Sequence, residues 1–76
     1  MPPGNIGVLQ EIEIQGDTIR LGQLLKLSGI AGSGAEAKAL LLDGSVTVNG
    51  EREVRRGRQL HVGDVVATEG ESVRVS

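Results

Sequence analysis

The chain has 76 residues, with eight lysines and arginines against ten aspartates and glutamates, and it lacks cysteine, phenylalanine, tyrosine and tryptophan. This length allows one domain with a small aliphatic core, and the lack of cysteine excludes disulfides, thiolate metal sites and a cysteine nucleophile. No apolar run approaches the roughly 20 residues of a membrane helix, and residues 1–5 do not resemble a signal peptide. We expect a cytoplasmic protein without membrane contact.

The net charge of −2 conceals an uneven distribution along the chain. Residues 1–17 and 63–76 have net charges of −3 and −2, whereas residues 18–62 carry seven cations against four anions. A basic centre between acidic ends indicates one anion-attracting face on a weakly acidic protein.

Local patterns predict the first elements in chain order. Residues 1–8 contain two prolines and two glycines and are predicted to be a flexible lead-in. Apolar and acidic residues alternate over Leu9–Ile14, which is typical of an edge strand, and Gly16-Asp17 supplies a turn. Apolar residues at helical spacing then predict a helix over Leu21–Ser28, with Gly29 as its stop.

The clearest helix signature begins at Ser33. Ser33 and Glu36 match a capping box, in which each side chain accepts a hydrogen bond from the other residue's backbone N–H. A helix is therefore predicted over Gly34–Asp43, with Gly44 as a left-handed terminating residue. Its predicted buried stripe consists of Ala37, Leu40 and Leu41.

Strand patterns occupy the rest of the chain. Val46–Val48 enters Asn49-Gly50, the dipeptide best suited to a tight hairpin turn, and further strands are predicted over Gln59–Val62, Val65–Thr68 and Ser72–Val75. The sequence thus predicts one α+β domain over 9–76, in which two short helices pack on a small, mostly antiparallel twisted sheet of about four to five strands.

The order of these motifs resembles the alpha-L RNA-binding motif of the ribosomal-protein-S-four type, over about two thirds of the chain. The motifs are Arg20-Leu21, Gly29, Ser33–Lys38, Gly44-x-Val46-x-Val48-Asn49-Gly50 and Gly63-Asp64-x-Val66. Two further segments, Leu24–Leu27 and Arg55–Arg58, are most similar to the short stand-alone YbcJ-like branch of that family. The chain departs from the family pattern at Gly22, Gly34 and Leu42, where many members carry an acidic residue, an arginine and a basic residue.

The resemblance implies a non-enzymatic, monomeric protein that binds structured RNA, such as ribosomal or transfer RNA, without a cofactor or small-molecule substrate. It also implies a setting in ribosome assembly or translation, or association with the ribosome or an RNA-modifying enzyme. The lack of aromatic side chains favours structured over single-stranded RNA, because single-strand binders stack bases on such side chains. The expected phosphate contacts are Arg20, Lys26, Lys38, Arg52, Arg55, Arg56 and Arg58.

Other interpretations stay open at this point. On charge alone, the arginines after the turn are more simply a solvated hairpin that pairs with Glu51 and Glu53; the resemblance reverses that preference. A protein-interaction module that recruits a partner through its acidic ends or a sheet edge is the main alternative. A ubiquitin-like sulfur carrier is disfavoured because Val73–Ser76 lacks Gly-Gly.

Catalytic groups are sparse. The single histidine, His61, alternates with apolar neighbours and is expected to point outward from a strand rather than to bind a metal. The glycines of Gly29–Gly34 are not followed by the lysine of a nucleotide-binding loop. Glu51 and Glu53 are expected on one face of a strand, beside arginines that would keep both ionised and unsuited to general acid catalysis.

Overall fold

The computed structural model of the protein describes residues 8–76. Residues 1–7 of the predicted lead-in lie outside this range, and Val8 is the first residue of a strand. In chain order, the elements are β1 (Val8–Ile12), β2 (Thr18–Arg20), α1 (Leu21–Leu27), α2 (Gly34–Asp43), β3 (Thr47–Val48), β4 (Glu51–Arg52), β5 (Gln59–His61), β6 (Val65–Thr68) and β7 (Glu71–Val75).

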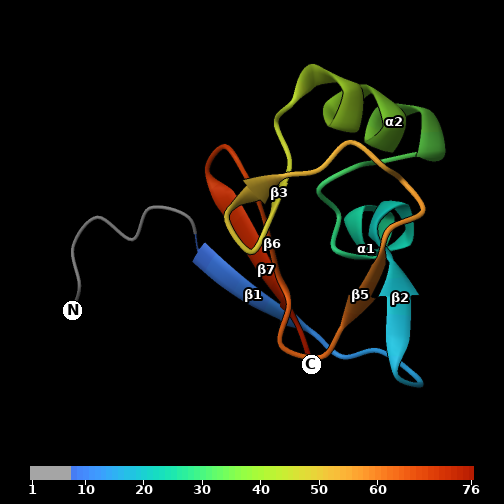
Figure 1. The fold of residues 1–76 in the computed structure, drawn as a ribbon, viewed down its shortest axis with the longest axis vertical. Helices are drawn as coiled ribbons and strands as arrows, with labels where there is room; N and C mark the ends of the chain where they lie inside the picture. The colour runs from blue at the N-terminus through green and yellow to red at the C-terminus, as the bar shows by residue number, and fades with distance from the viewer. Residues whose placement is uncertain (1–7) are drawn as a thin grey trace.

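The larger sheet has five strands in the order β1-β7-β6-β3-β4 (Figure 1). β1 pairs in parallel with β7, and the other neighbours are antiparallel. The parallel pair is possible because nearly the whole chain lies between its two strands as a crossover connection. The predictions of an N-terminal edge strand and of a small, mostly antiparallel sheet with two helices are confirmed.

A second sheet pairs β2 with β5 in antiparallel register, with Ile19 opposite Leu60. β2 and the second sheet were not predicted, because a three-residue strand is too short to show alternation and its partner is distant in the sequence. α1 follows β2 without a loop. The β2–β5 pair therefore fixes where α1 begins.

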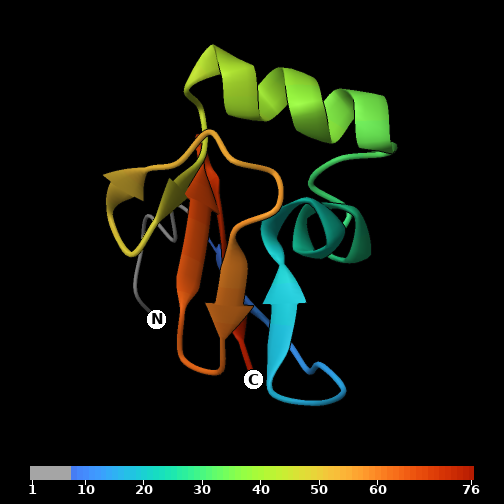
Figure 2. The ribbon, with the colours of Figure 1, turned by 45° about the vertical axis from the view of Figure 1, so that its right-hand side comes forward.

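The helices pack beside one another, with α2 lying across one end of the strands (Figure 2). α2 has the predicted bounds: the Ser33 hydroxyl accepts the N–H of Glu36 at 3.1 Å, and Gly44 ends the helix with a φ of +82°. The Glu36 carboxylate accepts the N–H of Gly32 rather than that of Ser33, so the second half of the predicted capping box is displaced by one residue. α1 ends at Leu27, one residue earlier than predicted.

One aliphatic core joins both helices to both sheets. Leu24 and Leu25 from α1 are fully buried with Leu60 from β5, and Leu41 from α2 is 1% exposed. Leu40 is partly buried against the same cluster. This shared packing holds the helices in a fixed position relative to β5, and the segment 53–58 that precedes β5 borders the surface described below.

Candidate nucleic-acid interface

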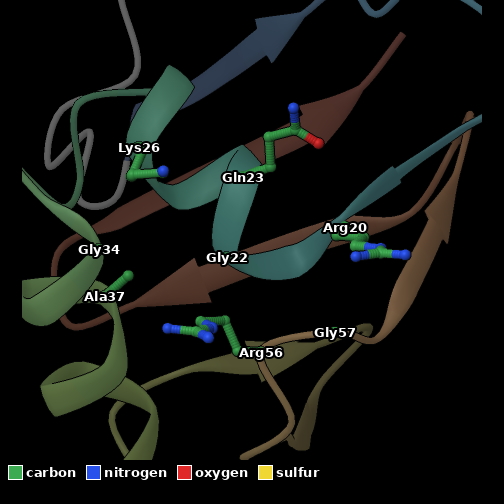
Figure 3. Close-up of a pocket in the computed structure, with 8 residues that line it drawn as sticks. All are labelled: Arg20, Gly22, Gln23, Lys26, Gly34, Ala37, Arg56 and Gly57. Atoms are coloured by element: carbon green, nitrogen blue, oxygen red, sulfur yellow. The ribbon is translucent and has the colours of Figure 1, made fainter.

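An open groove of about 680 Å³ lies between α1, the first turns of α2 and the segment 53–58. Three cationic side chains line it: Arg20, Lys26 and Arg56 (Figure 3). We call this surface the basic groove; its other lining residues are Gly22, Gln23, Gly34, Ala37 and Gly57. The structure thus gathers cations from a strand end, a helix and a loop into one concave surface.

The start of α1 holds the loop that carries Arg56. The N–H of Leu21 donates to the Arg58 carbonyl at 2.8 Å, and the N–H of Gly22 donates to the Arg56 carbonyl at 2.9 Å. The first N–H groups of a helix have no partner within the helix, and here the loop carbonyls satisfy two of them. Arg56 is therefore fixed by its backbone next to Arg20, the residue that precedes α1.

Gly22 leaves room for the Arg56 side chain. A Cβ at position 22 would lie 2.3 Å from Arg56 Cγ and 3.0 Å from Arg56 Cδ, both closer than van der Waals contact allows. The departure from the family pattern at Gly22 thus has a structural consequence. Any side chain at this position would push Arg56 out of its present place in the basic groove.

The buried carboxylate of Glu53 holds the segment 53–58 in place through hydrogen bonds. Glu53 is only 6% exposed. Its carboxylate accepts hydrogen bonds from the backbone N–H groups of Val54 and Arg55. It also accepts hydrogen bonds from the Arg55 guanidinium and, at 2.9 Å, from the Arg58 guanidinium. These bonds, above all those from Arg55, hold the pKa of Glu53 far below its usual range and raise the pKa of Arg55. The prediction that Glu51 and Glu53 share one strand face is wrong, because Glu53 lies beyond β4 and folds inward while Glu51 is exposed.

The predicted arginine cluster is thereby divided. Arg55 and Arg58 pair with Glu53, as the solvated-hairpin interpretation predicted for that acid, although the Arg55 side chain keeps 72% of its surface exposed. The Arg52 guanidinium lies over Gly44, at the C-terminal end of α2, where a positive charge is favourable to the helix dipole. Of the four arginines after the turn, only Arg56 lines the basic groove.

A smaller hollow of about 260 Å³ adjoins the basic groove and shares Arg56 with it. Lys38 from α2 also borders this hollow, so it lies near the groove rather than in it. The other lining residues are apolar: Leu41, Leu42 and Val54. Of the seven predicted contacts, the structure brings Arg20, Lys26 and Arg56 together, with Lys38 beside them.

Two groups that shape this surface were missed in the sequence. Gly22 was noted only as a departure from the family pattern, and Glu53 was treated as an exposed partner of the arginines. The spacing of Glu53 from Arg55 and Arg58 was visible, but its burial depends on the tertiary fold. The signal that the sequence offers for this arrangement is a carboxylate placed two and five residues before guanidinium groups.

The polar groups at the opposite end of the strands have structural roles. Asp64 accepts hydrogen bonds from the backbone N–H of His61 at 2.8 Å and from the Asn49 side-chain amide at 3.0 Å, which lower its pKa. Asn49 has a φ of +52° and ties the hairpin turn to the turn before β6. The His61 side chain is 65% exposed, as predicted. Across residues 8–76, no group of three or more metal-ligating side chains is present, and no helix is long and apolar enough to span a bilayer.

The sequence matches proteins whose names refer to RNA or to the ribosome. It is 51% identical over 59 residues to the probable ribosome maturation protein RlbA of Bacillus subtilis (strain 168), covering 78% of this chain and 83% of the relative. It is 40% identical over 57 residues to the putative RNA-binding protein YbcJ of Escherichia coli (strain K12), covering 75% of this chain and 81% of the relative.

The fold matches as well. The solution structure of YbcJ from E. coli aligns with a TM-score of 0.61 and 34% sequence identity, over 88% of this chain and 84% of that chain. That structure is described as revealing an alfaL motif involved in RNA binding, so the predicted resemblance is confirmed. A family model described as the S4 domain matches residues 12–76. The chain therefore belongs to the S4 domain family.

Proposed function

We propose that this protein binds structured RNA by holding backbone phosphates in the basic groove, with ribosomal RNA as its target. One observation carries the proposal. Within residues 8–76, the Arg20, Lys26 and Arg56 side chains all line one groove and have no ion pair or hydrogen bond with a protein group. Cations without a carboxylate partner in a concave surface attract a polyanion. One guanidinium group can also donate two parallel hydrogen bonds to two oxygens of the same phosphate.

The remaining arginines supply an internal contrast. Arg55 and Arg58 already donate to Glu53, and Arg74 donates to Glu11 across the β1–β7 pair. A cation that has a carboxylate partner gains less from a phosphate, because the phosphate must compete with that partner. We therefore rank Arg20, Lys26 and Arg56 as principal contacts, Lys38 next, and Arg52, Arg55 and Arg58 as secondary contacts.

The kind of RNA follows from the side chains that the chain lacks. It has no Phe, Tyr or Trp to stack successive unpaired bases, whereas a paired RNA helix is recognised through its shape, phosphates and 2′-hydroxyls. The names of the relatives RlbA and YbcJ support a cytoplasmic role in ribosome maturation. Such a role requires binding and positioning of RNA and no chemistry by this chain.

The proposal is tested by titrating a labelled, structured ribosomal RNA fragment at about 50 and 200 mM salt, with duplex DNA as competitor. Four phosphate contacts give a salt slope of about −3.6, so the fourfold rise in salt should weaken binding roughly 10²-fold. Arg56→Ala should lower the slope by about one. Arg74→Ala is the matched control, since it removes the same charge outside the groove and should leave the slope unchanged.

Two results would contradict the proposal. If Arg56→Ala and Arg74→Ala had equal salt slopes, RNA binding would depend only on the net charge of the protein. The basic groove would then not be the binding surface. The absence of binding even at the lower salt would favour the protein-interaction module, for which β1 and β4 supply the edges of the larger sheet.

A further inference from the structure

The hollow beside the basic groove differs from it in chemistry. We call it the apolar hollow; it is lined by Leu41, Leu42 and Val54, with Lys38 and Arg56 as its two cations. Leu42 is 70% exposed and Val54 is 51% exposed, although they come from different segments of the chain. Single exposed aliphatic side chains are ordinary on protein surfaces, but here two of them line one concavity together with a buried leucine.

We propose that the apolar hollow receives one unpaired nucleotide of the bound RNA, with its base against Leu42 and Val54 and its phosphate at Lys38. This inference rests on the proposed function and deepens it. The RNA target would then be a helix interrupted by a bulged or flipped-out nucleotide rather than a continuous duplex.

Size and position favour this occupant. The volume of about 260 Å³ lies below the range of roughly 300–1,000 Å³ typical of pockets for drug-sized ligands, which suits a single flat ring system. Arg56 lines both concavities, so a strand held in the basic groove passes directly beside the hollow. A guanidinium plane can also stack on an unstacked base.

Charge argues against a protein partner at the same place. A stable protein interface buries about 800 Å² on each side, far more than two aliphatic side chains supply. The cations at the hollow, Lys38 and Arg56, have no ion pair in the described part of the chain. Apolar atoms beside uncompensated cations complement a nucleotide, which carries an apolar ring face and an anion a short distance apart.

The test compares two RNA hairpins that share one duplex sequence and differ by a single bulged nucleotide. We expect the protein to bind the bulged RNA about fivefold more tightly. This is the lower end of the gain from stacking a base on an aromatic side chain, because the hollow offers aliphatic side chains and Arg56 instead. Leu42→Ser and Val54→Ser should each reduce this preference. Val62→Ser is the matched control: Val62 is 63% exposed and lines neither concavity, so its loss should leave the preference intact.

Methyl NMR gives a readout that needs no variant. The chain has no Phe, Tyr or Trp, and its one histidine, His61, lines neither concavity. An upfield ring-current shift that appears at the Leu42 and Val54 methyl groups when RNA is added therefore comes from an RNA base. We expect such shifts with the bulged RNA and not with the plain duplex, and no shift at Val62. Equal, salt-sensitive binding of both RNAs without methyl shifts would overturn this inference while the basic groove stands. Failure to bind either RNA at about 50 mM salt would overturn the proposed function and this inference together.

Discussion

Gly22 can be tested as a positioning residue that acts through Arg56. We expect Gly22→Ala to weaken RNA binding by removing the Arg56 guanidinium from the basic groove, while the protein stays folded. The added Cβ would lie 2.3 Å from Arg56 Cγ, far inside the roughly 3.5–4.0 Å of optimal carbon contact. The Arg56 side chain must therefore adopt another rotamer.

The cost to stability should be small. Alanine is about 1 kcal/mol more favourable than glycine inside a helix, whereas overpacking typically costs about 1–3 kcal/mol. The upper part of that cost applies to neighbours that cannot move, and Arg56 is exposed and free to turn outward. The Arg56 carbonyl, 3.4 Å from the new Cβ, is the less adaptable neighbour. We expect the free energy of unfolding to stay within about 1 kcal/mol of the parent value.

The effect on binding follows from the loss of one phosphate contact. Each contact contributes about 0.9RT ln(1/[salt]), which at about 100 mM salt is roughly 1.2 kcal/mol, or eightfold in affinity. The salt slope should fall by about one. Fluorescence anisotropy of a labelled ribosomal RNA fragment across a salt series measures both quantities, and far-UV circular dichroism checks folding in a chain that lacks tryptophan.

Gly34→Ala is the matched control. Gly34 is the first residue of α2 and lines the same groove, yet no atom lies within 4 Å of a Cβ at that position. Gly22→Ala should also have little further effect in an Arg56→Ala background, because the two changes remove the same contact. A full eightfold loss in that background would refute the reasoning, as would an unchanged affinity and slope in Gly22→Ala alone.

Three further predictions concern the scaffold. Glu53→Gln should lower the unfolding temperature; because the folded-state pKa of Glu53 lies below the ordinary 4.5, its contribution is present above about pH 4.5 and lost as pH falls. The variant should thus lose less stability than the parent between about pH 5 and 3. If the unfolding temperatures of the two proteins fell equally over this pH range, the result would count against the role of Glu53. Gly44→Ala should cost about 1 kcal/mol in urea unfolding, since Gly44 has a φ of +82°; no loss relative to Gly34→Ala would contradict this. Leu60→Ala removes a fully buried side chain that joins β5 to the core and should lower the free energy of unfolding by about 2–5 kcal/mol. A methyl NMR spectrum at 37 °C as well dispersed as that of the parent would show a folded variant and contradict this prediction.

Local signals allowed the helices and the hairpin turn to be predicted. The Ser33 cap, the Gly44 end and the Asn49-Gly50 turn each depend on a few adjacent residues, and each takes the expected conformation. β2 could not be found in this way, because its three residues form a strand only by pairing with β5. The fold class was accessible for a further reason, namely that the order of these local motifs is specific to the family.

The candidate site was less accessible because it depends on distances between segments. Arg55, Arg56 and Arg58 look equivalent in the sequence, but the backbone bonds to α1 and the burial of Glu53 assign them different surroundings. Lys26 and Arg20 are isolated cations in the sequence and become neighbours of Arg56 only when β2 pairs with β5. Sequence reasoning could therefore propose the set of cations and could not select among them.

Two of the departures from the family pattern meet at Arg56. At position 22, glycine opens the space that the Arg56 side chain crosses. At position 42, leucine forms an apolar wall next to Arg56. We therefore expect Arg56 to be the most important of the proposed contacts. If that is so, Arg56→Ala should weaken RNA binding more than any other single arginine replacement, and Glu53, which holds the loop, should affect binding without touching RNA.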